Sequence, residues 1–132
     1  MKTIEVAAAI IRREGKILAT ERGYGEFAGG WEFPGGKLEQ GEDGMTAAVR
    51  EIREELDVSV AVERLVCTVS YDYPTFHLVM HCYLCHVEAG QEMRLLEHAA
   101  ARWLDADGLD SVDWLSADIA VVQAIRDQGI LG

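Results

Sequence analysis

One segment, residues 35–58, constrains the fold of this chain more than any other. It reads GGKLEQGEDGMTAAVREIREELDV and contains seven acidic residues behind a glycine-rich start. Apolar side chains recur at separations of four, three and four residues, at Met45, Val49, Ile52 and Leu56. This spacing is typical of one face of an α-helix. We therefore expect a helix here, with its apolar face turned toward a core.

The same helix would bring three carboxylates together beside that apolar face. At ~100° per residue, Glu51, Glu54 and Glu55 fall within about a quarter turn. Like charges at this spacing destabilise a helix unless a counter-ion offsets them, and carboxylate oxygens suit Mg²⁺ or Mn²⁺. The alternative is a solvated acidic face, on which Arg50 and Arg53 act as local ion-pair partners. From the helix alone, both interpretations stand.

The loop in front of the helix favours the metal site. Gly36 is followed after five residues by Glu42, and after seven more by the run REIREELDV that starts at Arg50. This spacing resembles the Nudix box of the Nudix hydrolase family. The chain departs from the box once, because Asp57 stands where the family usually has Gly. Asp tolerates positive φ better than most residues, so we expect the chain to turn at Asp57 after the helix.

The resemblance covers nearly the whole chain, because segments 33–37 (FPGGK), 71–77 (YDYPTFH) and 114–118 (WLSAD) are similar to the MutT branch of the family. It implies an α+β fold, the Nudix αβα sandwich with a mixed sheet between helices, as one domain over residues 1–132. It implies Mg²⁺-dependent hydrolysis of nucleoside triphosphates, of the CTP/dCTP or 8-oxo-dGTP type, to nucleoside monophosphate and pyrophosphate. Mn²⁺ is the alternative cofactor.

The resemblance also assigns residues to the metal. The ligands it implies come from the loop, the helix and a later loop: the Gly35 carbonyl, Glu51, Glu54, Glu55 and Glu97. Glu42 would support these ligands through hydrogen bonds. Glu97 is included because it lies six residues before Trp103, where the MutT branch has a metal-binding loop carboxylate. Composition alone would make Glu97 a surface acid, and we expect the adjacent His98 to be a polar loop residue.

Catalysis in this family needs a carboxylate that takes a proton from water. The resemblance offers both Glu51 and Glu97 for that role, and neither is preferred by the sequence. Glu54 is the third candidate catalytic carboxylate. Arg50 is expected to orient glutamate side chains rather than to touch the substrate.

Candidates for nucleotide binding come from three parts of the chain. Lys37 and Arg22 are the expected contacts to phosphate or nucleotide. Phe33, Tyr73 and Phe76 are expected to line a slot in which a flat base stacks, with core packing as the expected role of at least one of them.

Asp118 matches a position at which the MutT branch carries an Asn or Asp thought to read the base. The alternative is that its charge simply favours the first turn of a helix. An ionised carboxylate only accepts hydrogen bonds. A base-reading Asp118 would therefore favour cytosine or guanine, including oxidised or methylated forms, over thymine and uracil.

The rest of the chain alternates strand-like and turn-like segments. Strands are expected at residues 3–12, 16–22, 31–33, 59–71, 76–87 and 99–104, with turns at 13–15 and 72–75. Residues 34–36 are expected to bend the chain into the acidic helix. A second helix is expected at 116–127, with Ser116 as its N-cap and Gly129 at its end, and with a core face formed by Ile119, Val122 and Ile125. This order predicts a mixed sheet covered on both faces.

Charge and hydropathy restrict the partners. The net charge is −11 and the isoelectric point is near 4.7, so a nucleic-acid polymer or an anionic membrane would be repelled. No apolar run approaches the ~20 residues of a membrane span, and Glu5 interrupts the N-terminal apolar stretch before it could act as a signal peptide. We expect a cytoplasmic monomer or homodimer whose partner is a small nucleotide.

Two of the three cysteines lie in the run HCYLCH, residues 81–86, which has some likeness to a metal knuckle. In a strand, side chains three residues apart point to opposite faces, so Cys82 and Cys85 could not close on one ion. We expect them to be ordinary buried thiols in a reducing compartment.

Three other functions share part of the pattern. Another Nudix specificity, such as ADP-ribose or dinucleoside polyphosphate hydrolysis, would share every box residue. A non-catalytic nucleotide sensor is disfavoured by the intact box carboxylates. An acidic cation-binding domain with no substrate is disfavoured by the glycine-rich loop and the ordered spacing.

Overall fold

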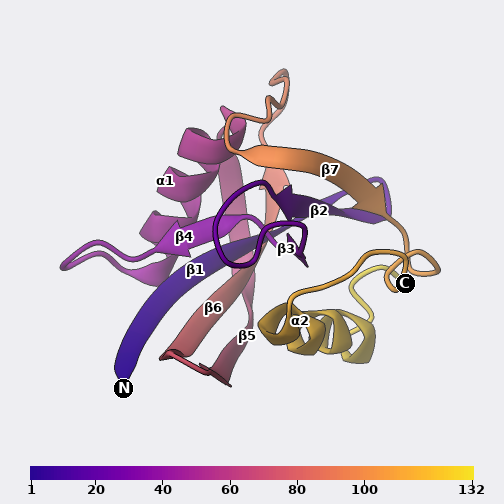
Figure 1. Cartoon of the computed structure of the whole chain (residues 1–132). Coiled ribbons are helices and arrows are strands. Elements are labelled where there is room, and N and C mark those ends of the chain that lie inside the picture. The colour runs from indigo at the N-terminus through magenta and orange to yellow at the C-terminus, as the bar shows by residue number, and fades with distance from the viewer.

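A computed structural model describes residues 1–132 as a mixed β-sheet with one helix on each side (Figure 1). The elements in chain order are β1 (Lys2–Arg13), β2 (Lys16–Arg22), β3 (Trp31–Glu32), β4 (Gly35–Lys37), α1 (Gly44–Leu56), β5 (Val60–Tyr73), β6 (Phe76–Val87), β7 (His98–Leu104) and α2 (Ser116–Asp127). Neither helix has the length and apolar run that crossing a membrane requires.

The sheet has the strand order β3-β2-β1-β6-β5, with β4 added to β1 and β7 added to β2. β1 and β6 run parallel, whereas β5 pairs with β6 and β2 pairs with β1 in the antiparallel sense. Parallel and antiparallel pairs therefore occur in one sheet, and helices cover it on both faces. This arrangement confirms the α+β sandwich predicted from the sequence.

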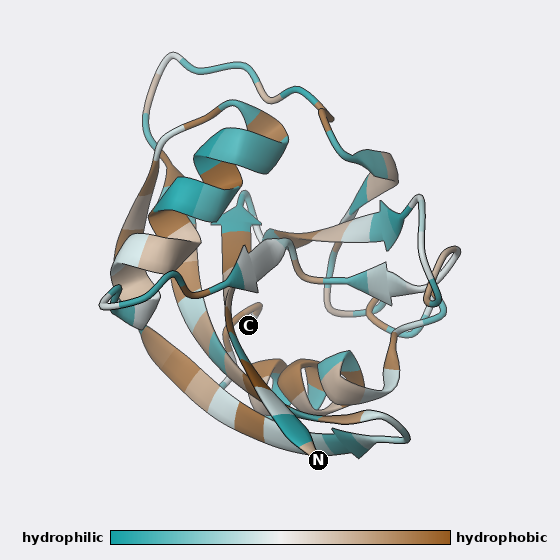
Figure 2. Cartoon of the chain, turned by 60° about the vertical axis from the view of Figure 1, so that its left-hand side comes forward, coloured by the Kyte–Doolittle hydropathy of each residue, from teal (hydrophilic) through white to brown (hydrophobic).

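The core is divided by the sheet into two main apolar clusters. Ile10 of β1 packs with Val121 of α2, while its neighbour Ile11 packs with Ile52 of α1. Adjacent residues of a strand point to opposite faces, so each long strand contributes to both clusters. Figure 2 shows this alternation as brown and pale bands along the long strands. Cys82 and Cys85 fall in different clusters, which confirms that they face opposite sides of the sheet.

The short strand β4 was missed by sequence reasoning, which expected only a bend at residues 34–36. Gly35 and Gly36 have low intrinsic strand preference, and the strand exists because they pair with Ala8 and Ala7 of β1. A Cβ on Gly35 would lie 2.1 Å from the Ala7 carbonyl oxygen. Glycine is therefore required for this close backbone approach.

Two residues expected in the core faces of the helices are instead exposed. Met45 of α1 is 51% exposed, because Ala47 and Ala48 make the close contact with Ala7 of β1. Ile119 of α2 is 58% exposed.

The ends of α2 also differ in part from expectation. Ser116 is not the N-cap, because Leu115 occupies that position and no side chain caps the helix. Gly129 follows the last turn with a φ of 62°, and the Ile130 amide donates to the Ile125 carbonyl at 3.1 Å. A left-handed glycine with such a bond ends many helices, so the expected stop at Gly129 is confirmed.

Asp57 is the C-cap of α1 and has a φ of 57° and a ψ of 36°. The positive φ inferred from the departure in the box is therefore confirmed. Asp57 also lies 3.9 Å from Arg53 in an exposed ion pair, which contributes little to stability.

We expect Asp57→Gly to change the free energy of unfolding by less than ~1 kcal/mol, because Gly removes the Cβ strain but adds unfolded-state entropy. Urea denaturation measures this change. Glu14→Gly is the matched control, since Glu14 has a φ of 52° in the β1–β2 turn. A loss above ~2 kcal/mol for Asp57→Gly alone would show that Asp57 makes a specific stabilising bond.

Candidate active site

One cavity of about 700 Å³ extends from the acidic face of α1 to the start of α2. Except for Arg50 and Glu42, every site residue predicted from the sequence lines it: Arg22, Phe33, Gly35, Lys37, Glu51, Glu54, Glu55, Tyr73, Phe76, Glu97 and Asp118. The fold thus brings β2, β4, α1, β5, β6, α2 and the loop before β7 to a single cleft.

Arg50 lies among the acidic side chains and holds three of them. Its Nε and Nη2 each donate to a different oxygen of Glu42 at 2.8 Å. Its Nη1 donates to Glu51 at 2.9 Å and to Glu54 at 3.3 Å. The hydrogen bonds from Arg50 hold the pKa of Glu42 at about 2. This geometry is that of a residue that orients glutamates.

Glu51 is enclosed by the glycine-rich loop. A Cβ added to Gly36 would lie 2.4 Å from the Glu51 carboxyl carbon, so only glycine leaves room for this side chain. Burial raises the pKa of Glu51, and the nearby charges of Glu54 and Glu97 raise it further. The fold therefore holds a carboxylate where its negative charge is disfavoured.

Glu55 is buried at the end of α1, where it meets a residue that the sequence placed wrongly. The His98 side chain is only 5% exposed, and its Nε2 lies 3.3 Å from Glu55 Oε1. His98 is therefore the first residue of β7 and a buried neighbour of the site rather than a polar loop residue. Glu55 Oε2 and His98 Nδ1 have no hydrogen-bond partner. Burial raises the pKa of Glu55 to about 7.

Glu97 lines the cavity from the loop that precedes β7 and takes part in no ion pair. The backbone of that loop is fastened to the end of α1. The Leu96 amide donates to the Glu55 carbonyl at 3.0 Å, and the Arg94 amide donates to the Leu56 carbonyl at 2.9 Å. These bonds keep Glu97 on the same cleft as the helix carboxylates.

The chemistry of these residues fits a hard divalent cation. Glu51, Glu54, Glu55 and Glu97 face one cavity, and Glu55 Oε2 is a buried oxygen without a donor. Clustered carboxylate oxygens are the donors that Mg²⁺ prefers. The structure gathers no three of these side chains into a ready metal-holding group, because Arg50 holds two of them and Glu55 faces His98. Binding of a cation therefore requires glutamates to turn from Arg50 toward it.

Aromatic and apolar side chains form the other end of the cavity. Tyr73 stacks on Phe76 with ring centroids 5.0 Å apart and an interplanar angle of 26°. Phe27, which the sequence did not single out, lies with its ring centroid 5.0 Å from that of Tyr73. Phe33 is 3% exposed and stacks on Trp114 at 4.7 Å, so core packing is its main role.

Asp118 lies in the wall of this apolar end and is only 4% exposed. Its Oδ1 accepts a hydrogen bond from the Phe33 amide at 3.0 Å. Burial raises the pKa of Asp118 to about 8. Burial therefore favours the protonated form of Asp118 near neutral pH, whereas the sequence suggested an ionised carboxylate.

Arg22 lines the cavity, but its guanidinium is already paired. Nε and Nη2 donate to the two oxygens of Glu32 at 3.0 and 2.8 Å. This pairing uses Nε and Nη2 only, so a contact from Arg22 to phosphate or nucleotide stays a prediction. Glu32 is a wall residue that sequence reasoning missed, because the two-residue strand β3 gives no pattern that reveals its position beside β2.

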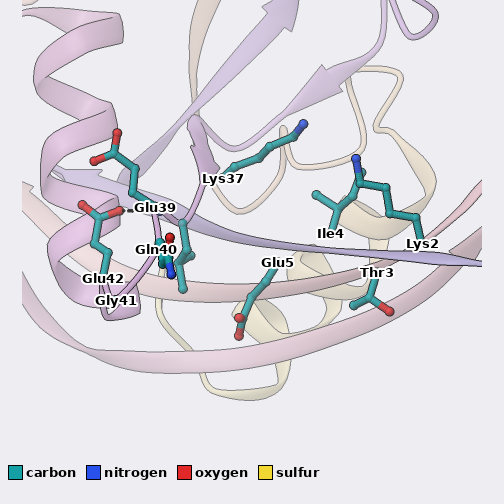
Figure 3. Close-up of a pocket in the computed structure, with 10 residues that line it drawn as sticks. Lys2, Thr3, Ile4, Glu5, Lys37, Glu39, Gln40, Gly41 and Glu42 are labelled. Carbon is teal, nitrogen blue, oxygen red and sulfur yellow. Dashed lines mark hydrogen bonds between the residues drawn. The ribbon is translucent and has the colours of Figure 1, made fainter.

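Lys37 is the cation of the cleft that has no acidic partner. It stands between the main cavity and a second, more polar cavity of about 420 Å³ beside the start of β1. Figure 3 shows Lys37 extending away from Glu39 and Glu42 on the side toward Lys2. A free ammonium group at this position suits a phosphate.

Comparisons with known proteins agree with this geometry. A family model described as a NUDIX domain matches residues 1–124. The chain is 37% identical over 126 residues to the CTP pyrophosphohydrolase of Escherichia coli (strain K12), with 94% of this chain and 92% of that protein covered. It is 30% identical over 128 residues to the 8-oxo-dGTP diphosphatase of the same organism, with 96% and 98% covered. The crystal structure of a MutT NUDIX hydrolase from Burkholderia pseudomallei matches with a TM-score of 0.85 and 29% identity, covering 95% of this chain and 99% of that one.

Proposed function

Because the chain belongs to the Nudix hydrolase family, we propose that it hydrolyses nucleoside triphosphates of the CTP or 8-oxo-dGTP type to nucleoside monophosphate and pyrophosphate. The observation that carries this proposal is a single cavity lined by the carboxylates of α1 and Glu97 and also by aromatic side chains and the buried acid Asp118. Relatives with those two substrate names support the choice of nucleotide.

We assign the metal to the carboxylate end of the cavity. Glu51, Glu54, Glu55 and Glu97, with the Gly35 carbonyl, would hold Mg²⁺, or Mn²⁺ in its place. Bound there, the ion supplies charge neutralisation for the phosphates and makes water more acidic. Glu42 fixes Arg50, and Arg50 in turn orients Glu51 and Glu54.

The chain's own groups then position the substrate and take the proton. Lys37 contacts the phosphate chain at the mouth of the cleft. Glu51 or Glu97 accepts a proton from the attacking water. Glu97 has no ion-pair partner, whereas Glu51 is bonded to Arg50 at 2.9 Å. Holding these groups on one rigid cleft lowers the entropic cost of bringing water and phosphorus together.

The base occupies the end of the cavity opposite the carboxylates. Tyr73 and Phe76 offer a stacked aromatic surface, and Asp118 faces the edge of the base. Stacking on aromatic side chains tolerates every base, so the polar edge must supply the discrimination.

One assay tests the proposed function. Canonical and oxidised nucleoside triphosphates, ADP-ribose and a dinucleoside polyphosphate are each incubated with Mg²⁺, and release of pyrophosphate and of phosphate is measured. The proposal requires pyrophosphate from a cytidine or guanine triphosphate. Hydrolysis of ADP-ribose or the dinucleotide alone would indicate another Nudix specificity, and binding without any turnover would indicate a nucleotide sensor.

We expect Mg²⁺ to raise the melting temperature of the protein, and EDTA to lower it if the purified protein retains metal. A cation relieves repulsion between the clustered carboxylates, and at ten times the dissociation constant it stabilises the folded state by about 1.4 kcal/mol. Differential scanning fluorimetry with millimolar Mg²⁺ measures the shift. Glu55→Gln should reduce this Mg²⁺-induced shift of the melting temperature. An unchanged melting temperature in the parent protein would argue against the assignment of a cation to these carboxylates.

A further inference from the structure

His98 occupies a position that neither a surface loop nor ordinary core packing explains. Its imidazole is buried against Glu55 with Nε2 3.3 Å from Oε1, while the other oxygen, Oε2, is buried and has no hydrogen-bond donor. Both residues belong to one enclosed pair at the edge of the cleft. One oxygen of Glu55 is therefore held, and the other is left available.

The backbone around His98 is shaped to make this contact. The pairing of β2 with β7 shifts register between Glu21 and Arg22, so that Glu21 pairs with Ala100 and Arg22 pairs with His98. Bulges next to active sites commonly re-aim a side chain. Here His98 turns toward Glu55 while the preceding residue, Glu97, lines the cavity.

We propose that His98 is a positioning residue, which holds Oε1 of Glu55 so that only Oε2 is offered to the metal. The proposal rests on the function proposed above, because it assigns Glu55 and Glu97 to a divalent cation. Removing a residue that hydrogen-bonds to a metal-ligating side chain typically changes metal affinity or activity 10–100-fold.

Two amide substitutions test the role of the Nε2 position. In His98→Gln the amide nitrogen can reach about as far as Nε2, whereas in His98→Asn it can reach only about as far as Nδ1. We expect His98→Asn to raise the dissociation constant for Mn²⁺ by roughly tenfold or more, measured by calorimetry without nucleotide. It should also lower kcat, with little change in KM for the nucleotide. His98→Gln should stay close to the parent protein in both measurements.

Two further variants separate positioning from a general structural effect. His86→Asn is the matched control, because His86 lies 3.3 Å from Glu63 in a histidine–glutamate pair that lines no part of the cleft. It should leave Mn²⁺ affinity unchanged. In a Glu55→Gln background, His98→Asn should weaken Mn²⁺ binding no further, because the residue through which it acts has already lost its charge.

The outcomes distinguish this inference from the proposed function. A parent protein that binds Mn²⁺ and hydrolyses nucleoside triphosphates, with His98→Asn binding Mn²⁺ equally well, overturns the positioning role alone. Equal losses in His98→Gln and His98→Asn, or an additive loss with Glu55→Gln, also overturn it. A parent protein that binds no Mn²⁺ and hydrolyses no nucleotide overturns both proposals.

Discussion

Glu54→Gln and Glu55→Gln are each expected to lower nucleoside triphosphate turnover by roughly a hundredfold or more, because each removes a carboxylate charge central to metal and proton chemistry. The two residues line the same cavity from successive positions on α1. Their side chains differ in environment, since Glu55 is 6% exposed while the Glu54 side chain is 54% exposed. A similar loss in both variants would therefore report shared chemistry rather than shared packing.

Neither substitution should unfold the protein. Gln preserves the volume of Glu, and burial already disfavours the charged form of Glu55. Circular dichroism and the melting temperature in EDTA check the fold, and initial rates with saturating Mg²⁺ check turnover. Glu63→Gln is the control, because Glu63 of β5 pairs with Arg12 of β1 and His86 of β6 and lines no part of the cleft. Near-normal turnover in both Glu54→Gln and Glu55→Gln would refute the assignment of the metal to this helix.

The carboxylates of α1 could be placed on one face from the sequence because helix geometry is local. Residues three and four apart share a face whatever the rest of the chain does, so Glu51, Glu54 and Glu55 needed only the helix to be correct. The left-handed turn at Asp57 was predicted from the resemblance, because the family usually has Gly at this position. Asp tolerates positive φ better than most residues, so the substitution of Asp for that Gly kept the turn in place.

Other features depend on contacts between distant segments and leave no local pattern. β4 exists because β1 supplies its pairing partners, and Glu32 reaches the cavity because β2 lies beside it. Ile119 was misplaced because the apolar stripe of α2 was assigned from side-chain type. The fold instead buries a carboxyl group, which accepts a bond from Phe33, and exposes an isoleucine. His98 was missed because a bulge decides where it points.

The buried acid Asp118 should also make the stability of the protein depend on pH. Its pKa is about 8 in the folded protein and ~3.9 in an unfolded chain. The stabilising contribution of this group is therefore fully present below about pH 4 and is lost as the pH rises through about 8, with a slope of ~1.4 kcal/mol per pH unit between them. Asp118→Asn cannot ionise, so it should become progressively more stable than the parent protein over this range. Urea denaturation in EDTA measures the difference, and a constant difference would contradict the buried acid.

The same titration should be visible in the choice of base. Oδ1 of Asp118 accepts from the Phe33 amide at 3.0 Å, which leaves Oδ2 as the atom that can meet a base edge. Below about pH 8 the protonated Asp118 carboxyl can donate or accept a hydrogen bond. It can therefore pair with the carbonyl of uracil as well as with the amine of cytosine. Above its pKa the Asp118 carboxylate only accepts, and uracil then faces acceptor against acceptor.

We expect the kcat/KM ratio of CTP to UTP to rise between about pH 6 and about pH 9 in the parent protein. Asp118→Asn, whose amide does not titrate, should hold the ratio flat, and Asp118→Ala should lower it by slowing CTP hydrolysis. Equal losses on CTP and UTP in Asp118→Ala, with no change of the ratio with pH in the parent protein, would show that Asp118 only holds Phe33 in place and does not read the base.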